Sequence, residues 1–242
     1  MFLWTEESIK WIDRAAIYTG YYKKLANAIK EYLSPSDHIC EIACGTGHLA
    51  MELSPYVKEI NAVDISEQSI EFAMKKKSTL KEGTIGGNVY FEACDWQEYC
   101  ADKNFDVIIF TYFGIQEDQW KALQDSAQRC IIAALPFEKT WRRSSEFKKE
   151  EVTDEKKENC IETVEGLLKV IETNNLNYEM ETLTIEFGQP FNNENEIEDY
   201  LDHYYPSLNE NERSEKKNKI QKKGRIVYLP KKKNLAIIKV VR

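Results

Sequence analysis

Apolar, strand-like runs alternate with helix-like segments five times within the first 136 residues of the chain. The runs are short and rich in β-branched and aromatic residues, and they lie at 38–42, 60–65, 89–93, 105–113 and 130–135. The segments between them carry apolar residues at helical spacing. Strands that alternate with helices pair in parallel, because each helix returns the chain across the sheet. The pattern predicts an α/β fold: a doubly wound, mostly parallel sheet with helices on both faces.

The flanking segments extend this plan. Residues 5–33 have the spacing of amphipathic helices, with Thr5 as an N-cap. A run at 178–187 and a last run at 234–241 complete a seven-stranded sheet, and a polar, helical insertion separates them. We therefore expect one domain over residues 1–242. Its expected parts are an N-terminal helical cap (1–35), a core (36–136), the rest of the sheet with its helix (137–191 and 225–242) and a lid-like insertion (192–224).

Composition limits the class of protein. Charged residues make up 31% of the chain and no apolar run approaches the length of a membrane span, so we expect a soluble protein. The first residues do not resemble a signal peptide. Several of the six cysteines lie in apolar runs, where reduced cysteine packs as a small hydrophobe, so we expect a cytoplasmic location. The net charge of −8 argues against a protein built mainly to bind phosphate backbones.

The turn after the first strand carries the chemistry. Its sequence, "CEIACGTGHLA" at 40–50, fits the dinucleotide fingerprint G-x-G-x-x-G/A, and Asp64 ends the second strand at a suitable distance to bond a ribose. Glu41 separates two ligand classes. A carboxylate beside the turn repels pyrophosphate, which binds a bare helix N-terminus. It suits a ligand that carries positive charge, such as the ammonium and sulfonium of S-adenosylmethionine.

Four segments resemble the motifs of class I S-adenosylmethionine-dependent methyltransferases. They are "ICEIACGTG", "AVDIS", "EACDW" and "FDVIIFTYFG", and they follow one another in the order of that family. The resemblance covers roughly residues 36–136, and it implies a Rossmann-like fold, S-adenosylmethionine as cofactor and S-adenosylhomocysteine as product.

The resemblance also implies a role for each matching residue. Gly45 and Gly47 would let the backbone approach the methionine part of the cofactor, and Glu41 would hold its amino group. Asp64 would accept hydrogen bonds from the ribose hydroxyls. The residues expected around the adenine and the reacting methyl group are Ile65, Asp95, Trp96 and Thr111.

Ala43 departs from the family pattern, which usually has its first glycine there. Because a Cβ atom penalises the left-handed region, we expect Ala43 to have a negative φ and to be a tolerated small residue in the cofactor turn.

Other interpretations remain open. The spacing of Cys40 and Cys44 lacks a third ligand, so we expect no metal site. The candidates for a catalytic group are His203, in the insertion, and Tyr112, at the end of the fourth strand. The N/D-P-P-Y/F motif of many nitrogen methyltransferases is missing at that strand. We predict methylation of a small-molecule acceptor. The alternatives are methylation of RNA or protein through the basic segments near 142–149 and 216–233, a cofactor-binding module without catalysis, and a nucleotide-binding oxidoreductase.

Overall fold

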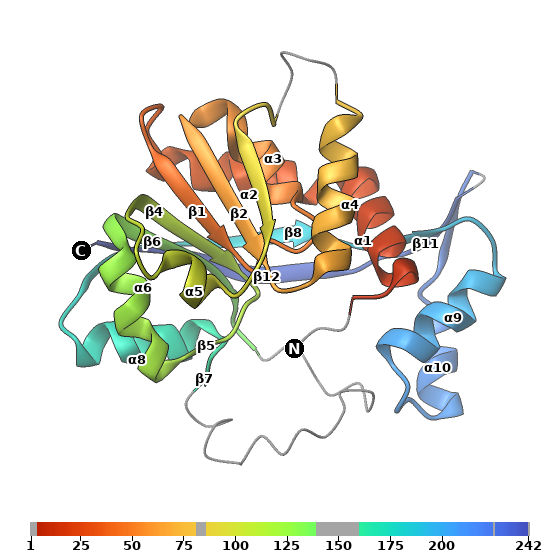
Figure 1. The fold of residues 1–242 in the computed structure, drawn as a ribbon. Helices are drawn as coiled ribbons and strands as arrows, with labels where there is room; N and C mark the ends of the chain where they lie inside the picture. The colour runs from red at the N-terminus through yellow and green to blue at the C-terminus, as the bar shows by residue number, and fades with distance from the viewer. Residues whose placement is uncertain (1–3, 81–85, 139–159, 225, 242) are drawn as a thin grey trace.

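A seven-stranded sheet forms the centre of the protein in a computed structural model that describes residues 4–80, 86–138, 160–224 and 226–241 (Figure 1). The strand order is β3–β2–β1–β4–β6–β12–β8. The strands are β1 (His38–Ile42), β2 (Glu59–Asp64), β3 (Val89–Ala93), β4 (Phe105–Thr111), β6 (Ala127–Pro136), β8 (Asn177–Glu186) and β12 (Lys232–Val241). β12 runs antiparallel to the other six strands, which are parallel to one another, so the predicted fold class is confirmed.

Helices cover both faces of this sheet, and each face has its own apolar core. One face carries α2 (Tyr21–Ile29), α3 (His48–Leu53) and α4 (Glu67–Ser78). The other face carries α5 (Trp96–Cys100), α6 (Trp120–Ser126) and α8 (Val164–Thr173). Along β4, Val107 and Ile109 enter the first core, while Ile108 and Phe110 enter the second. The central strand is therefore buried on both faces, as its sequence predicts.

The predicted helix caps are present. The Thr5 side chain accepts a hydrogen bond from Ser8 N–H at the start of α1 (Glu6–Thr19), and Ser66 accepts one from Ser69 N–H at the start of α4. Each cap satisfies an amide that has no partner inside the helix, a contribution of about 1 kcal/mol.

The insertion forms a separate layer with α1 (Figure 1). It consists of β9 (Gln189–Phe191), α9 (Asn195–Tyr204), α10 (Glu210–Lys217), β10 (Gln221–Lys223) and β11 (Ile226–Leu229). The three strands pair in a small antiparallel sheet, in the order β10–β11–β9. The structure therefore differs from the expected boundaries, since 226–229 pairs with this small sheet and not with the main one.

Trp11 of α1 fixes this layer. Its ring packs against Tyr200, 5.4 Å away between centroids, and against Tyr204, 5.9 Å away, both on α9. Arg14 adds an ion pair with Glu196 at 2.8 Å. The N-terminal helix and the insertion thus form one cap beside the sheet.

The remaining elements are short. They are β5 (Ile115–Gln116), β7 (Cys160–Ile161) and the 3-10 helices Lys30–Tyr32, Ser54–Tyr56 and Glu117–Gln119. The fourth strand ends at Thr111, earlier than its apolar run suggests. Within the described part of the chain, none of the helices has both the length and the apolar character to cross a bilayer.

Six of the seven strands point the same way, so their carboxyl ends share one edge of the sheet. We call this the ligand edge, because ligands of such sheets bind beyond the carboxyl ends of the strands.

Candidate functional site

The turn after β1, residues 43–47, is wound in the left-handed region at three positions. Ala43, Gly45 and Gly47 have φ values of 52°, 53° and 69°. The expectation of a negative φ at Ala43 is therefore wrong. The turn reverses tightly between β1 and α3, and it imposes this conformation whatever residue stands there. An alanine in the left-handed region costs roughly 1–2 kcal/mol relative to the right-handed one.

The two glycines have different neighbours. A Cβ atom on Gly47 would lie 2.4 Å from a ring carbon of Phe91 on β3, so this glycine permits close packing of the turn on the sheet. A Cβ atom on Gly45 would lie 2.6 Å from Cζ2 of Trp4. The indole of Trp4 therefore occupies the space directly over Gly45, on the outer side of the turn.

Asp64 connects the turn to β2. Its Oδ2 accepts a hydrogen bond from Gly45 N–H at 2.7 Å, and its Oδ1 accepts one from Ser66 N–H at 2.9 Å. Burial raises the pKa of this carboxyl group, and hydrogen bonds from Ser66, Gly45 and Ser69 oppose the rise. A carboxylate has about four acceptor positions, so Asp64 can still accept hydrogen bonds from a ligand.

Glu41 lies at the end of β1 and is almost completely buried. Among the residues that the structure describes, its Oε2 has no hydrogen-bond partner, although this oxygen is shielded from solvent. Burial raises the pKa of this carboxyl group to about 8, the Ala50 N–H opposes the rise, and the nearby Asp64 adds to it. Leaving a buried polar atom unpaired costs about 1–3 kcal/mol, so this oxygen indicates a missing partner with a proton to donate.

The residues expected around an adenine occupy three different environments. Ile65 follows β2 and is 52% exposed, which leaves its side chain open to a ligand. Asp95 caps α5 by accepting a hydrogen bond from Gln97 N–H at 2.7 Å. Trp96 packs in the core with α6 and α8, so its ring is a part of that core.

An aromatic group lies beyond the end of β4. Thr111 is partly exposed there, and Tyr112 follows it with a φ of +50°. Tyr112 packs against the core beside Tyr21 of α2, and burial raises the pKa of both hydroxyls. Tyr22 stacks on His48 of α3, with ring centroids 5.1 Å apart. These side chains border the ligand edge on the α2 face of the sheet.

His203 lies away from this group. It sits on α9, with its ring 5.5 Å from Trp11 and 4.7 Å from Tyr204. The structure thus places Tyr112 at the ligand edge and His203 in the aromatic contact between α1 and the insertion.

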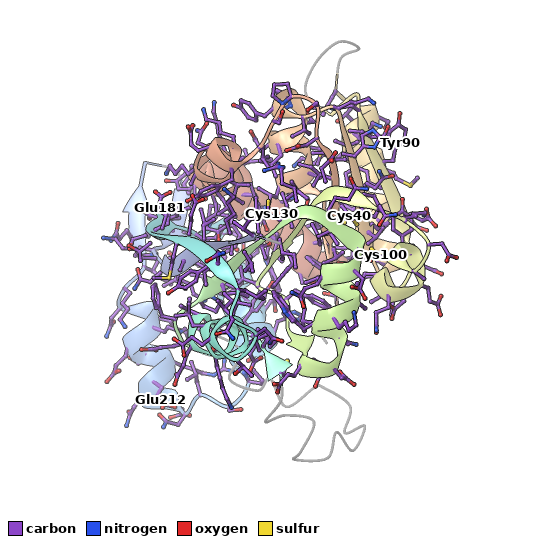
Figure 2. All side chains as sticks on the ribbon, turned by 90° about the vertical axis from the view of Figure 1, so that its left-hand side faces the viewer. Cys40, Tyr90, Cys100, Cys130, Glu181 and Glu212 are labelled. Atoms are coloured by element: carbon purple, nitrogen blue, oxygen red, sulfur yellow. The ribbon has the colours of Figure 1, made fainter. Side chains whose placement is uncertain are left out.

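Cys40, Cys44, Cys100 and Cys130 are buried and pack as small apolar residues. The Sγ atoms of Cys40 and Cys100 lie 3.9 Å apart in the core beneath β1, and Figure 2 labels both. Cys44 belongs to the core on the opposite face.

A polar cluster between the N-terminal helix and the turn was not predicted from the sequence. His48 Nε2 lies 2.9 Å from Asp13 Oδ1 and 3.0 Å from Lys76 Nζ, and Lys76 also pairs with Asp13. Burial lowers the pKa of His48. The cluster ties α1 to α3 and α4, and so places Trp4 next to the turn. Its only signal in the sequence was His48, directly after the second glycine.

Comparison with known proteins identifies the family to which the chain belongs. A family model described as "Methyltransferase domain" matches residues 33–184, which is more than half of the chain. The chain belongs to this methyltransferase family. It is an S-adenosylmethionine-dependent enzyme of class I, as its four motifs predict. No curated protein matches the chain in sequence.

Solved methyltransferase structures share the fold at low sequence identity. The precorrin-6y C5,15-methyltransferase of Geobacter metallireducens is 12% identical with a TM-score of 0.54, over 91% of this chain and 87% of that one. The magnesium protoporphyrin IX methyltransferase of Synechocystis, solved with S-adenosylhomocysteine, is 13% identical with a TM-score of 0.51, over 99% and 89%. The N-methyltransferase NodS of Bradyrhizobium japonicum is 12% identical with a TM-score of 0.51, over 90% and 93%.

The left-handed conformation of Ala43 predicts a stabilising substitution. Ala43→Gly removes the steric penalty and should raise the free energy of unfolding by about 1 kcal/mol in urea denaturation. Ala28→Gly, in the helix α2, is the matched control and should lower it by about 0.5–1 kcal/mol. A loss of stability in the Ala43 variant would show that its Cβ contributes more to packing than the strain costs.

Proposed function

We propose that this methyltransferase acts on a small-molecule acceptor and that Glu41 receives the amino group of the cofactor. The observation that supports the second part is the buried Oε2 of Glu41 beside the turn of residues 43–47, which has no hydrogen-bond partner within the described part of the chain. An ammonium group supplies both the hydrogen-bond donor and the charge that this oxygen lacks.

The other residues of the turn fit the same cofactor. Gly45 has no side chain on the side where a ligand would lie against the turn, and Asp64 holds its N–H in place. We propose that Asp64 also accepts hydrogen bonds from the ribose hydroxyls with its remaining lone pairs. Ile65, exposed after β2, would cover the adenine, and Asp95 and Trp96 would border it from the end of β3. Bound S-adenosylmethionine supplies an electrophilic methyl group.

The chain itself must place the acceptor and exclude water. Thr111, Tyr112, Tyr21 and Tyr22 gather at the ligand edge, where α2 covers it. Methyl transfer from a sulfonium depends mainly on placing the acceptor atom in line with the methyl group. We propose that these aromatic residues form the acceptor side of the site and that the insertion closes it.

The basic segments give less support to an RNA acceptor. The segment 142–149 lies outside the described residues. In the segment 216–233, Lys217 pairs with Glu198, and Lys222 pairs with Glu194 at 3.0 Å. Lys216 lies 3.7 Å from the centre of the Tyr205 ring. Cations with such partners are less available to a phosphate backbone, so the small-molecule acceptor is the better-supported choice. The three neighbours compared above include porphyrin and corrin methyltransferases by name.

Glu41→Gln tests the proposed amino-group site. The variant keeps the shape of the side chain but cannot become charged, so S-adenosylmethionine binding measured by calorimetry should weaken roughly ten- to hundred-fold, the range for a hydrogen bond to a charged group. Glu52→Gln, on the neighbouring helix α3, should bind as the wild type does. Equal affinity of the Glu41 variant and the wild type would contradict the assignment.

The raised pKa of Glu41 also predicts how stability depends on pH without cofactor. The folded protein keeps the Glu41 proton up to a pKa of about 8, whereas the ordinary pKa of a glutamate is 4.5. The contribution of Glu41 to stability is therefore fully present below the lower value and declines as the pH rises toward the higher one, by up to about 1.4 kcal/mol per pH unit. In the same denaturation series, Glu41→Gln should flatten this decline.

Trp4→Ala tests the position of the indole over Gly45. A cofactor that lies against this glycine must displace the indole, so the variant should bind S-adenosylmethionine several-fold more tightly. Glu7→Ala, in the exposed first turn of α1 three residues after Trp4, should leave the affinity unchanged. Weaker binding by the Trp4 variant would show instead that the indole forms a wall of the occupied site.

A further inference from the structure

Lys233 lies at the ligand edge although no motif contains it. It stands near the start of β12 and pairs with Ile185 near the end of β8. Two residues later, Leu235 pairs with Pro136 at the carboxyl end of β6. Because β12 is antiparallel, its first residues lie beside the carboxyl ends of the other strands.

Lys233 also projects toward the face that Glu41 occupies. Side chains alternate along a strand, and Leu235 belongs to the same core cluster as Ile39 of β1. Lys233 is therefore on the side of the sheet covered by α2, as Glu41 is. Tyr22 belongs to the same surroundings, because burial raises the pKa of its hydroxyl and the neighbouring Glu41 and Tyr112 add to the rise.

The amine of Lys233 is surrounded by aromatic rings. Its Nζ lies 4.0 Å from the centre of the Tyr112 ring and 5.3 Å from that of Phe187, which follows β8. Tyr21 packs on Phe187 from α2, with ring centroids 4.6 Å apart. In the described ranges no carboxylate forms an ion pair with Lys233, in contrast to Lys239 on the same strand, which pairs with Glu179 at 2.9 Å.

The charged groups around Lys233 do not offset a positive charge on its amine. Lys231 is positive, and its Nζ lies 3.3 Å from the Tyr205 hydroxyl. Glu186, near the end of β8, accepts a hydrogen bond from Tyr228. Tyr21, Tyr22 and Tyr112 are neutral because burial raises their pKa values. Burial of the Lys233 amine, together with the charge of Lys231, lowers its pKa to about 7.

We propose that Lys233 is a catalytic residue that takes the proton of an acidic hydroxyl, of the phenol type, on the methyl acceptor. The proposal rests on the methyltransferase function above and names the acceptor class for that site. The aromatic rings of Tyr112 and Phe187 suit a flat ring, and an amine without a carboxylate partner suits an oxygen that becomes an anion.

The step balances without a further reactant. The neutral amine of Lys233 accepts the proton of the hydroxyl. The acceptor oxygen donates an electron pair to the methyl carbon while the bond between that carbon and the sulfonium sulfur breaks, and its electron pair stays on sulfur. The products are a methyl ether, the neutral thioether S-adenosylhomocysteine and a lysine ammonium, which then releases its proton to water.

4-Nitrophenol is a probe for this site, because its phenolate absorbs visible light and its neutral form does not. The full chain, saturated with S-adenosylhomocysteine, is titrated with pH in the presence of the probe. A lysine ammonium next to the bound phenolate should lower the pKa of the bound probe by about one unit or more. Lys233→Met should abolish this shift, and Lys233→Arg should restore it, because arginine keeps the positive charge.

Lys231→Met is the matched control, since it removes the neighbouring lysine, and it should leave the shift in place. Calorimetry with S-adenosylhomocysteine comes first. Failure of the wild type to bind it would refute the proposed function itself. If all variants bind it, two results overturn the role of Lys233 alone: no shift in the wild type, or an equal shift in Lys233→Met.

Discussion

The hydrogen bond from Gly45 N–H to Asp64 is the contact on which the site depends. It joins the turn after β1 to the end of β2, and it holds a turn with three left-handed positions in place. That turn leaves Glu41 buried beneath it, with one oxygen that no residue in the described ranges pairs with. The fold stabilises this arrangement with two packed cores, one on each face of the sheet. The buried Oε2 of Glu41 therefore lowers the stability of the protein locally, within a structure that is otherwise well packed, as is typical of binding sites.

Two layers meet over this turn. The sheet supplies the turn and the residues at the ligand edge, while α1 and the insertion form a cap through Trp11. The cluster of Asp13, His48 and Lys76 links the cap to the turn itself. A displacement of α1 would therefore shift Trp4 and His48 together.

Local patterns predicted most of the fold. The strands β1 and β3 have the bounds that their apolar runs indicate, and Ser66 is the cap that its position suggests, because such features depend on neighbours in the chain. The positive φ of Ala43 was missed, since it is imposed by the geometry of the turn. Lys233 and Trp4 were missed for another reason: their partners Tyr112 and Gly45 lie far away in the sequence and come close only in the folded chain.

The central claim is that the buried carboxyl group of Glu41 is neutral in the empty site and becomes charged against the amino group of the cofactor. Infrared difference spectroscopy at about pH 7 detects this change directly. A protonated carboxyl group has a C=O stretching band, and this band is lost when the group ionises to a carboxylate. The account predicts that adding S-adenosylhomocysteine removes such a band in the wild type and that Glu41→Gln shows no loss. A band that persists in the saturated wild-type protein would contradict it.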